Sequence, residues 1–160
     1  MPMQNIETER KFLVDREKWS RLEKPAGIDY VQGYLSIDAE KIVRVRVAGN
    51  KGFLTIKGKS KTYSRPEFEY EIPASEAREM LRLFTISQVK KVRTRIPAGN
   101  HVWEIDEFHG ANEGLIVAEI ELENPGDLFE KPDWVGEEVT EDNRYYNAYL
   151  SVNPYGTWKK

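Results

Sequence analysis

The sequence predicts a mainly β protein of the α+β class, whose strands form one antiparallel sheet that closes, or nearly closes, on itself. Three observations predict it. About eight segments alternate apolar and charged residues, as half-buried strands do. Most of them are joined by tight turns, such as Gly49-Asn50 and Gly99-Asn100. Few segments have helical periodicity, so we expect helices at the ends or along the outside of the sheet.

The expected strands follow one another along most of the chain. In the first of them, the segment IETERKF at residues 6–12, side chains alternate between faces, so Glu7, Glu9 and Lys11 share one side. Strands are expected at residues 3–14, 30–38, 41–49, 51–59, 65–73, 87–97, 101–109 and 113–124.

Helices are expected in four places. Asp15 is a suitable N-cap for the first, and an apolar stripe of Met80, Leu81 and Phe84 defines the second. Because Pro154 cannot continue a helix, the last one should end before it. The expected helices span residues 15–23, 75–84 and 125–131, and run from Thr140 until Pro154.

Composition limits the function classes. The length of 160 residues is typical of one domain, residues 1–160, with a substantial core. A net charge of −3 gives no support to a general nucleic-acid-binding surface. The absence of cysteine excludes disulfides and thiolate metal sites. We see neither a signal peptide nor an apolar run long enough for a membrane span, and therefore expect a cytoplasmic protein that interacts with no membrane.

The alternation also gathers like charges on one face of nearly every strand. Such a face is usually solvated surface on a half-buried antiparallel sheet. However, like charges on neighbouring strands repel, and these positions are almost purely ionic. The side chains that share the charged faces are Arg44 and Arg46, Lys57 and Lys59, Glu67, Glu69 and Glu71, Lys91, Arg93 and Arg95, Glu104 and Asp106, and Glu119, Glu121 and Glu123.

If these faces point inward, they must line a hydrated lumen, because desolvating so many ions would be prohibitive. An eight-stranded barrel has room for side chains or for one small ligand. Converging Lys and Arg side chains suit a phosphate chain. Carboxylates beside that chain would repel it unless divalent cations lie between them, and Mg²⁺ or Mn²⁺ binds oxygen ligands together with phosphates.

The ordered motifs resemble the CYTH superfamily, also called triphosphate tunnel metalloenzymes, and in particular its short bacterial branch. The Glu-x-Glu-x-Lys of the first strand is a weak signal by itself, whereas the ordered set is specific. The matching segments are ETERK at 7–11, QGYL at 32–35, RVR at 44–46, LTIKGK at 54–59, EFEYEIP at 67–73, KVR at 91–93, WEIDEFHG at 103–110, AEIELE at 118–123 and GEEVTEDNRYYN at 136–147.

The resemblance implies a closed antiparallel eight-stranded β-barrel that forms a hydrophilic tunnel, in which a triphosphate is hydrolysed with Mg²⁺ or Mn²⁺. It implies metal ligation by Glu7, Glu9, Glu119, Glu121 and Asp106. It implies triphosphate binding by Lys11, Arg44, Arg46, Lys57, Lys91 and Arg93. It implies a catalytic role in proton handling for Tyr34 with Lys11 or a nearby lysine, and places Glu69 and Asp106 near a second metal or the attacking water. By residue type alone, Tyr34 fits packing as well as chemistry.

Other residues have less defined expectations. The segment GEEVTEDNRYYN is expected to close one end of the tunnel. The family gives no firm role to further residues on the charged faces, which we expect around the site or at its rim: Lys59, Arg95, Glu67, Glu71, Glu104 and Glu123.

The expected substrate is a small-molecule triphosphate, and inorganic tripolyphosphate comes first because no base or thiazolium pocket is evident. Hydrolysis would yield pyrophosphate and phosphate. The alternatives are an adenylate cyclase that converts ATP to cyclic AMP, a thiamine triphosphatase, and a non-catalytic module that binds polyphosphate or nucleotides. The sequence leaves the oligomeric state open, with a homodimer among the options.

Overall fold

The computed structural model describes residues 5–38, 40–59, 61 and 63–158. Its strands agree with the sequence prediction to within a few residues, except that β8 is shorter than expected and one strand is additional. Residues 3 and 4, at the start of the first expected strand, lie outside the described residues. The strands are β1 (Ile6–Val14), β2 (Ile28–Ile37), β3 (Lys41–Ala48), β4 (Lys51–Gly58), β5 (Ser64–Ile72), β6 (Ser87–Ala98), β7 (His101–Phe108), β8 (Ile116–Glu121) and β9 (Val135–Glu138).

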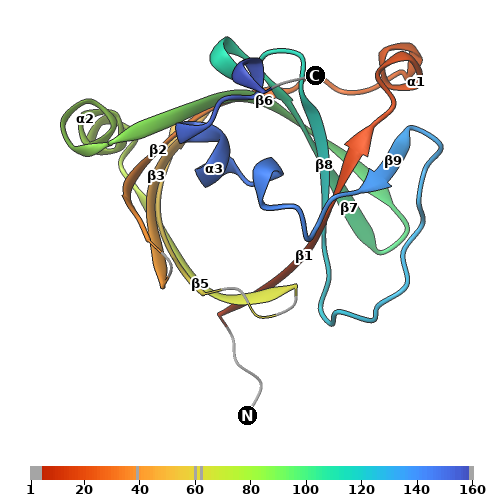
Figure 1. The fold of residues 1–160 in the computed structure, drawn as a ribbon, viewed down its shortest axis with the longest axis horizontal. Helices are drawn as coiled ribbons and strands as arrows, with labels where there is room; N and C mark the ends of the chain where they lie inside the picture. Colours follow the sequence, from red (N-terminus) through yellow and green to blue (C-terminus); the bar gives the residue numbers. More distant parts are fainter. Residues whose placement is uncertain (1–4, 39, 60, 62, 159–160) are drawn as a thin grey trace.

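Eight antiparallel strands close into a barrel, as predicted. The order around the ring is β5-β4-β3-β2-β6-β7-β8-β1, and β1 returns to pair with β5. Figure 1 looks along this ring and shows it closed. The additional strand β9 pairs with the far end of β1, outside the ring.

Two glycine turns set the register of two strand pairs in this barrel. Gly49 and Gly99 both have a φ of 61°, a left-handed conformation that glycine adopts without a steric penalty. Each begins a two-residue connection, one between β3 and β4 and one between β6 and β7. A two-residue hairpin fixes which residues face each other along the whole strand pair.

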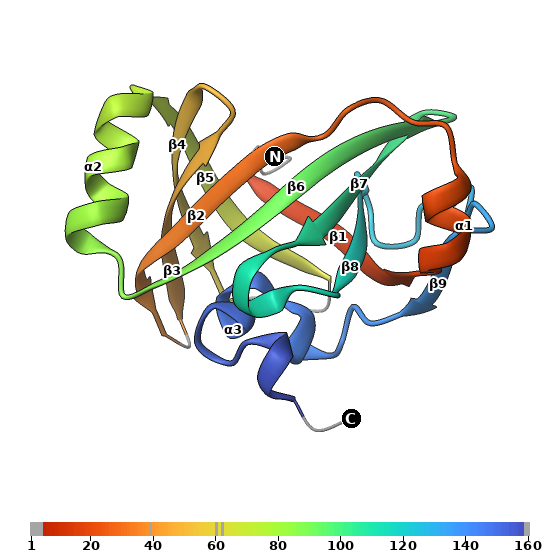
Figure 2. The ribbon, with the colours of Figure 1, turned by 90° about the horizontal axis from the view of Figure 1, so that it is seen from above.

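Two hydrophobic clusters lie outside the ring, and a third fills one end of it. Phe12 and Trp103 point away from the lumen and pack with Trp19 of helix α1 (Arg16–Arg21). On the opposite side, Val45 packs against Leu81 of helix α2 (Ala74–Phe84). A third cluster lies inside one end of the barrel, where inward-facing Val89 and Val117 pack with Leu150 of helix α3 (Asn147–Val152). Figures 1 and 2 show α1 and α2 on the outside of the wall. Because α1 and α2 cover outward apolar faces and α3 covers the apolar end, the charged side chains line the rest of the interior.

The helices expected at residues 15–23 and 75–84 are present as α1 and α2. In α1, the Asp15 side chain accepts a hydrogen bond from the Lys18 backbone N–H at 3.0 Å, which confirms Asp15 as the N-cap. Three short 3₁₀ turns are also present: η1 (Gly110–Asn112), η2 (Asn143–Tyr145) and η3 (Tyr155–Thr157). In the described part of the chain, no helix has the length and apolar character that a membrane span requires.

The helix expected at 125–131 is wrong, because tertiary packing holds that segment in an irregular path. Phe129 lies 6.0 Å from Phe12 and 5.7 Å from Trp103, measured between ring centroids. The Trp103 indole N–H donates to the backbone carbonyl of Glu130 at 3.1 Å. These contacts require Phe129 and the Glu130 carbonyl to face the same cluster.

The last helix begins at Asn147 rather than at Thr140. The backbone of β1 still holds the chain at that point: Val139 N–H donates to the Lys11 carbonyl at 2.8 Å. The Lys11 N–H donates to the Thr140 hydroxyl at 2.9 Å. The sequence analysis did not predict β9, whose four residues include Gly136 and form a strand only by pairing with β1.

An ion pair ties β9 to β1 and gives a pH-dependent prediction. Hydrogen bonds from Arg10 lower the pKa of Glu138 below its ordinary value of 4.5. A lowered folded-state pKa stabilises the fold above the ordinary pKa, and this contribution is lost as pH falls through the folded pKa. We expect Glu138→Gln to lower the free energy of unfolding by at most about 1 kcal/mol at neutral pH, and by less at about pH 3, below the ordinary pKa of glutamate.

Urea denaturation of wild type and variant at both pH values measures this difference. The neighbouring, exposed Glu137 is the matched control, and Glu137→Gln should change stability little at either pH. A loss for Glu138→Gln that is equal at both pH values would contradict the ion-pair account.

Candidate functional site

The barrel encloses a cavity of about 700 Å³ whose wall is strongly charged. Its lining confirms that the charged faces of the strands point inward and do not form a solvated outer surface. Among the residues expected at the site, those that line the cavity are Glu7, Glu9, Lys11, Tyr34, Arg44, Arg46, Lys57, Glu69, Lys91, Arg93, Glu119 and Glu121.

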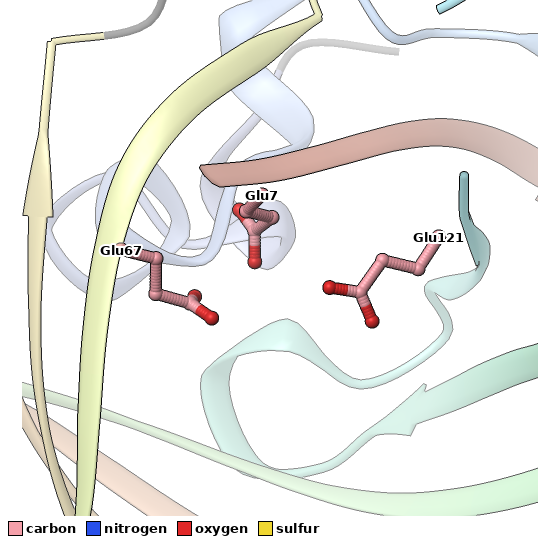
Figure 3. Close-up of side chains that lie close together, drawn as sticks. All are labelled: Glu7, Glu67 and Glu121. Atoms are coloured by element: carbon pink, nitrogen blue, oxygen red, sulfur yellow. The ribbon is translucent and has the colours of Figure 1, made fainter. Parts of the chain in front are cut away.

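Three carboxylates from three strands converge at one side of this cavity. Glu7 of β1, Glu67 of β5 and Glu121 of β8 each offer an oxygen, and these oxygens lie within 4.8 Å of one another. Figure 3 shows the three side chains pointing toward a common space. The pairing of β1 with both β5 and β8 brings the three strands together.

The electrostatics of this acidic cluster show an excess of negative charge. Burial would raise the pKa of Glu7, but the ammonium of Lys57, 3.1 Å away, together with Glu67 and Arg65, lowers it to about 2. Burial and a hydrogen bond with Glu7 raise the pKa of Glu67 to about 7. Burial and the nearby carboxylates of Glu7 and Glu104 also raise the pKa of Glu121. Without another cation, a proton must therefore offset part of the charge.

Glu9, at the next inward position of β1, also has a raised pKa. Burial, followed by repulsion from Glu119 and Glu7, raises the pKa of Glu9 to about 8. The ammonium of Lys11 lies 3.9 Å from Glu9 but only 2.5 Å from Glu119, so it stabilises the charge of Glu119 more than that of Glu9. Crowded carboxylates with raised pKa values, all hard oxygen donors, fit a divalent cation of the Mg²⁺ type.

Cations gather on another part of the wall. Burial, and then repulsion from Arg44 and Arg93, lowers the pKa of Arg46 to about 10. The buried Nε of Arg44 has no hydrogen-bond partner within the described ranges. Guanidinium groups that repel one another and retain an unused donor fit an anion with several acceptor oxygens, such as a phosphate chain.

Lys91 and Arg93 meet behind this surface at Asp106. Asp106 is completely buried; it lies 2.8 Å from the Lys91 ammonium and binds the Arg93 guanidinium through both carboxylate oxygens at 2.7 and 2.9 Å. It is absent from the cavity lining, unlike the other expected site residues. Burial, opposed by attraction to Asp106 and reinforced by repulsion from Arg93 and Arg46, lowers the pKa of Lys91 to about 7. A direct metal-binding role for Asp106 stays a prediction.

Two further expected residues have defined partners. Glu69 accepts a hydrogen bond from the Thr55 hydroxyl at 2.8 Å and lies 3.4 Å from Arg44. Tyr34 is 2 % exposed, and its hydroxyl oxygen accepts a hydrogen bond from Gln32 at 2.9 Å. Both side chains therefore have fixed positions at the cavity wall.

The sequence analysis underrated or missed several residues here. It placed Glu67 around the site or at its rim, whereas Glu67 belongs to the acidic cluster. Arg65 lines the cavity 3.4 Å from Glu7, and it was missed although it shares the inward parity of Glu67. Of the other rim expectations, Arg95 and Glu104 line the cavity, whereas the lining does not include Lys59, Glu71 or Glu123.

The C-terminal segment covers one end of the barrel, as expected for GEEVTEDNRYYN. Figure 1 shows α3 lying across the ring, and Figure 2 shows the same segment beneath the ends of β2 and β6. The Tyr146 ring lies 4.8 Å from the Lys11 ammonium, and the Asn147 side chain accepts a hydrogen bond from Lys91 at 2.9 Å. The sequence gives no signal for these two contacts.

Comparisons with known proteins agree with this geometry. An inorganic triphosphatase of Acetivibrio thermocellus is 48% identical over 155 residues, covering 96% of this chain and 98% of that protein. An inorganic triphosphatase of Nitrosomonas europaea is 34% identical over 152 residues, covering 92% of this chain and 97% of that protein. The crystal structure of the inorganic triphosphatase NE1496 has a TM-score of 0.63 at 30% identity, covering 91% of this chain and 94% of that chain. The CYTH domain profile matches residues 5–149, and the chain therefore belongs to the CYTH domain family.

Proposed function

We propose that the protein is a divalent-metal-dependent triphosphatase that hydrolyses inorganic tripolyphosphate to pyrophosphate and phosphate. One observation carries the proposal: a carboxylate cluster and an arginine cluster face the same cavity from different strands. The two relatives that are named inorganic triphosphatases support it, because each matches this chain over nearly its whole length.

In this proposal, Glu7, Glu67 and Glu121 hold Mg²⁺ or Mn²⁺, with Glu9 and Glu119 beside them. The donor set supports this choice, because carboxylate oxygens are the ligands that these cations share with phosphates. When bound, the cation supplies charge neutralisation and orientation of the phosphate oxygens.

The cations of the wall bind the triphosphate. Two unit charges about 4 Å apart attract by about 4 kcal/mol at an effective dielectric constant of 20, so several converging contacts outweigh moderate desolvation losses. Arg44, Arg46 and Arg93 offer donors to phosphate oxygens, and Lys57 and Lys91 add point charges. Catalysis of phosphoryl transfer consists mainly of such positioning and charge stabilisation.

One assay separates this function from its alternatives. We expect the protein with Mg²⁺ or Mn²⁺ to release phosphate from tripolyphosphate faster than from ATP or thiamine triphosphate, and to lose turnover when EDTA removes the metal. Phosphate, pyrophosphate and cyclic AMP are measured for each substrate. Pyrophosphate with cyclic AMP from ATP would indicate an adenylate cyclase, and binding without turnover would indicate a non-catalytic module.

A further inference from the structure

Gln32 of β2 is a fully buried amide that no functional expectation covers, and both of its ends are engaged by residues of the cavity wall. Its Oε1 accepts hydrogen bonds from Nε and a terminal nitrogen of Arg46 at 3.1 and 3.0 Å. Its Nε2 donates to the Tyr34 hydroxyl at 2.9 Å. Gln32 itself is absent from the cavity lining, so it acts from behind these two side chains.

Chemistry fixes the orientation of this amide. A guanidinium has only donors, so the oxygen of Gln32, and not its NH₂ group, must face Arg46. The NH₂ group therefore faces Tyr34, whose oxygen must accept. A phenol hydroxyl has one hydrogen, which cannot point at the NH₂ group and is available on the other side.

In the part of the chain that the structure describes, the hydrogen of Tyr34 consequently has no protein acceptor. Within the described ranges, Gln32 is the one hydrogen-bond partner recorded for the Tyr34 hydroxyl, although the side chain is almost completely buried. Because Tyr34 lines the cavity, a ligand there is the available acceptor. This arrangement makes Tyr34 a donor to an anion rather than a proton acceptor.

Among the residues that the structure describes, Arg46 lacks the carboxylate partner that its neighbouring arginines have, as the Tyr34 hydroxyl hydrogen lacks an acceptor. Arg93 is paired with Asp106 and Arg44 lies near Glu69, whereas in the described part of the chain no carboxylate lies within ion-pair distance of Arg46. The neutral amide of Gln32 fixes the guanidinium without cancelling its charge. The full positive charge of Arg46 is therefore left for a ligand.

We propose that Gln32 is a positioning residue that aims the Tyr34 hydroxyl and the Arg46 guanidinium at the same phosphate group of the substrate. This rests on the proposed triphosphatase function, since a bound phosphate chain supplies the missing acceptor. In this proposal Tyr34 and Arg46 are two donors to one anion, and the Gln32 amide holds both in place.

The test is a double-mutant cycle with Gln32→Glu and Tyr34→Phe. A carboxylate at position 32 still accepts from Arg46, but it turns the Tyr34 hydrogen away from the cavity, because it can no longer donate. The added negative charge weakens anion binding whether or not the hydroxyl is present. Only the extra loss seen with the hydroxyl present reports its orientation.

We expect Gln32→Glu to reduce kcat/KM for tripolyphosphate about 10-fold more in the otherwise wild-type protein than in the Tyr34→Phe protein, as for loss of one hydrogen bond to a charged group. Equal losses in the two proteins, within about twofold, would overturn the proposal, because independent sites add within that range. Thermal unfolding of all four proteins excludes misfolding as the cause.

Titration calorimetry on the four metal-free proteins also measures the dissociation constant of tripolyphosphate, which gives the same cycle for binding alone. A wild-type protein that binds tripolyphosphate without hydrolysing it would overturn the triphosphatase function, while this binding cycle still tests Gln32. A cycle without coupling in an active protein would overturn only the role of Gln32.

Discussion

Glu121→Gln is expected to reduce tripolyphosphate turnover by about 10²–10³-fold, the range seen when one preorganised charge-stabilising group is lost. The variant keeps the size of the side chain but removes one of the three converging carboxylates, and with it a ligand of the proposed cation. Apparent affinity for Mn²⁺ should fall in parallel. Steady-state kinetics across a Mn²⁺ titration measure both quantities.

The folding stability of the same variant should be unchanged or slightly higher without metal. Burial, and then repulsion from Glu7 and Glu104, raises the pKa of Glu121, so a neutral amide at this position avoids both penalties. The matched control is Glu123→Gln, two residues further along, which removes an exposed carboxylate that does not line the cavity. Equal activity of the two variants would contradict the proposed cation site.

Asp106→Asn is expected to lower the free energy of unfolding by about 3–5 kcal/mol, because removing one partner leaves buried charges uncompensated. Asp106 is 0% exposed, and both Lys91 and Arg93 depend on its charge. Urea denaturation at neutral pH measures the change. Activity should fall as well, since these two cations would lose their positions at the wall.

The control is an exposed ion pair. Glu17→Gln removes the partner of Arg21 on α1, where both side chains are more than 70% exposed, and should cost less than about 0.5 kcal/mol. An Asp106→Asn variant with wild-type stability but weakened Mn²⁺ binding would instead favour the metal-binding role that the family pattern gives to Asp106.

Much of the site could be predicted because strand alternation is a strict rule. Once Glu9 was placed on an inward face, Glu7 and Lys11 had to join it, and the same parity located Arg44, Arg46 and Arg93. The glycine turn at Gly99 contains still more information. It pairs Ala98 with His101 and thereby sets Arg93 opposite Asp106, an ion pair that this turn could have predicted.

Parity alone could not show which carboxylates meet. Glu67, Glu69 and Glu71 look equivalent within β5, and the closure of β1 against β5 selects Glu67, because Glu7 faces Arg65 there. That register depends on the whole barrel rather than on any one turn. The path of residues 125–131 depends likewise on the distant Trp103, which local propensity cannot reveal.

A crystal structure of the protein with Mn²⁺ and tripolyphosphate tests the central claim most directly, since anomalous scattering locates the metal independently of the rest of the map. We predict a Mn²⁺ peak inside the barrel, coordinated by Glu7, Glu67 and Glu121, and phosphate oxygens within hydrogen-bond distance of Arg44 and Arg46. Manganese at the exterior of the barrel, or a phosphate chain bound away from these arginines, would contradict it.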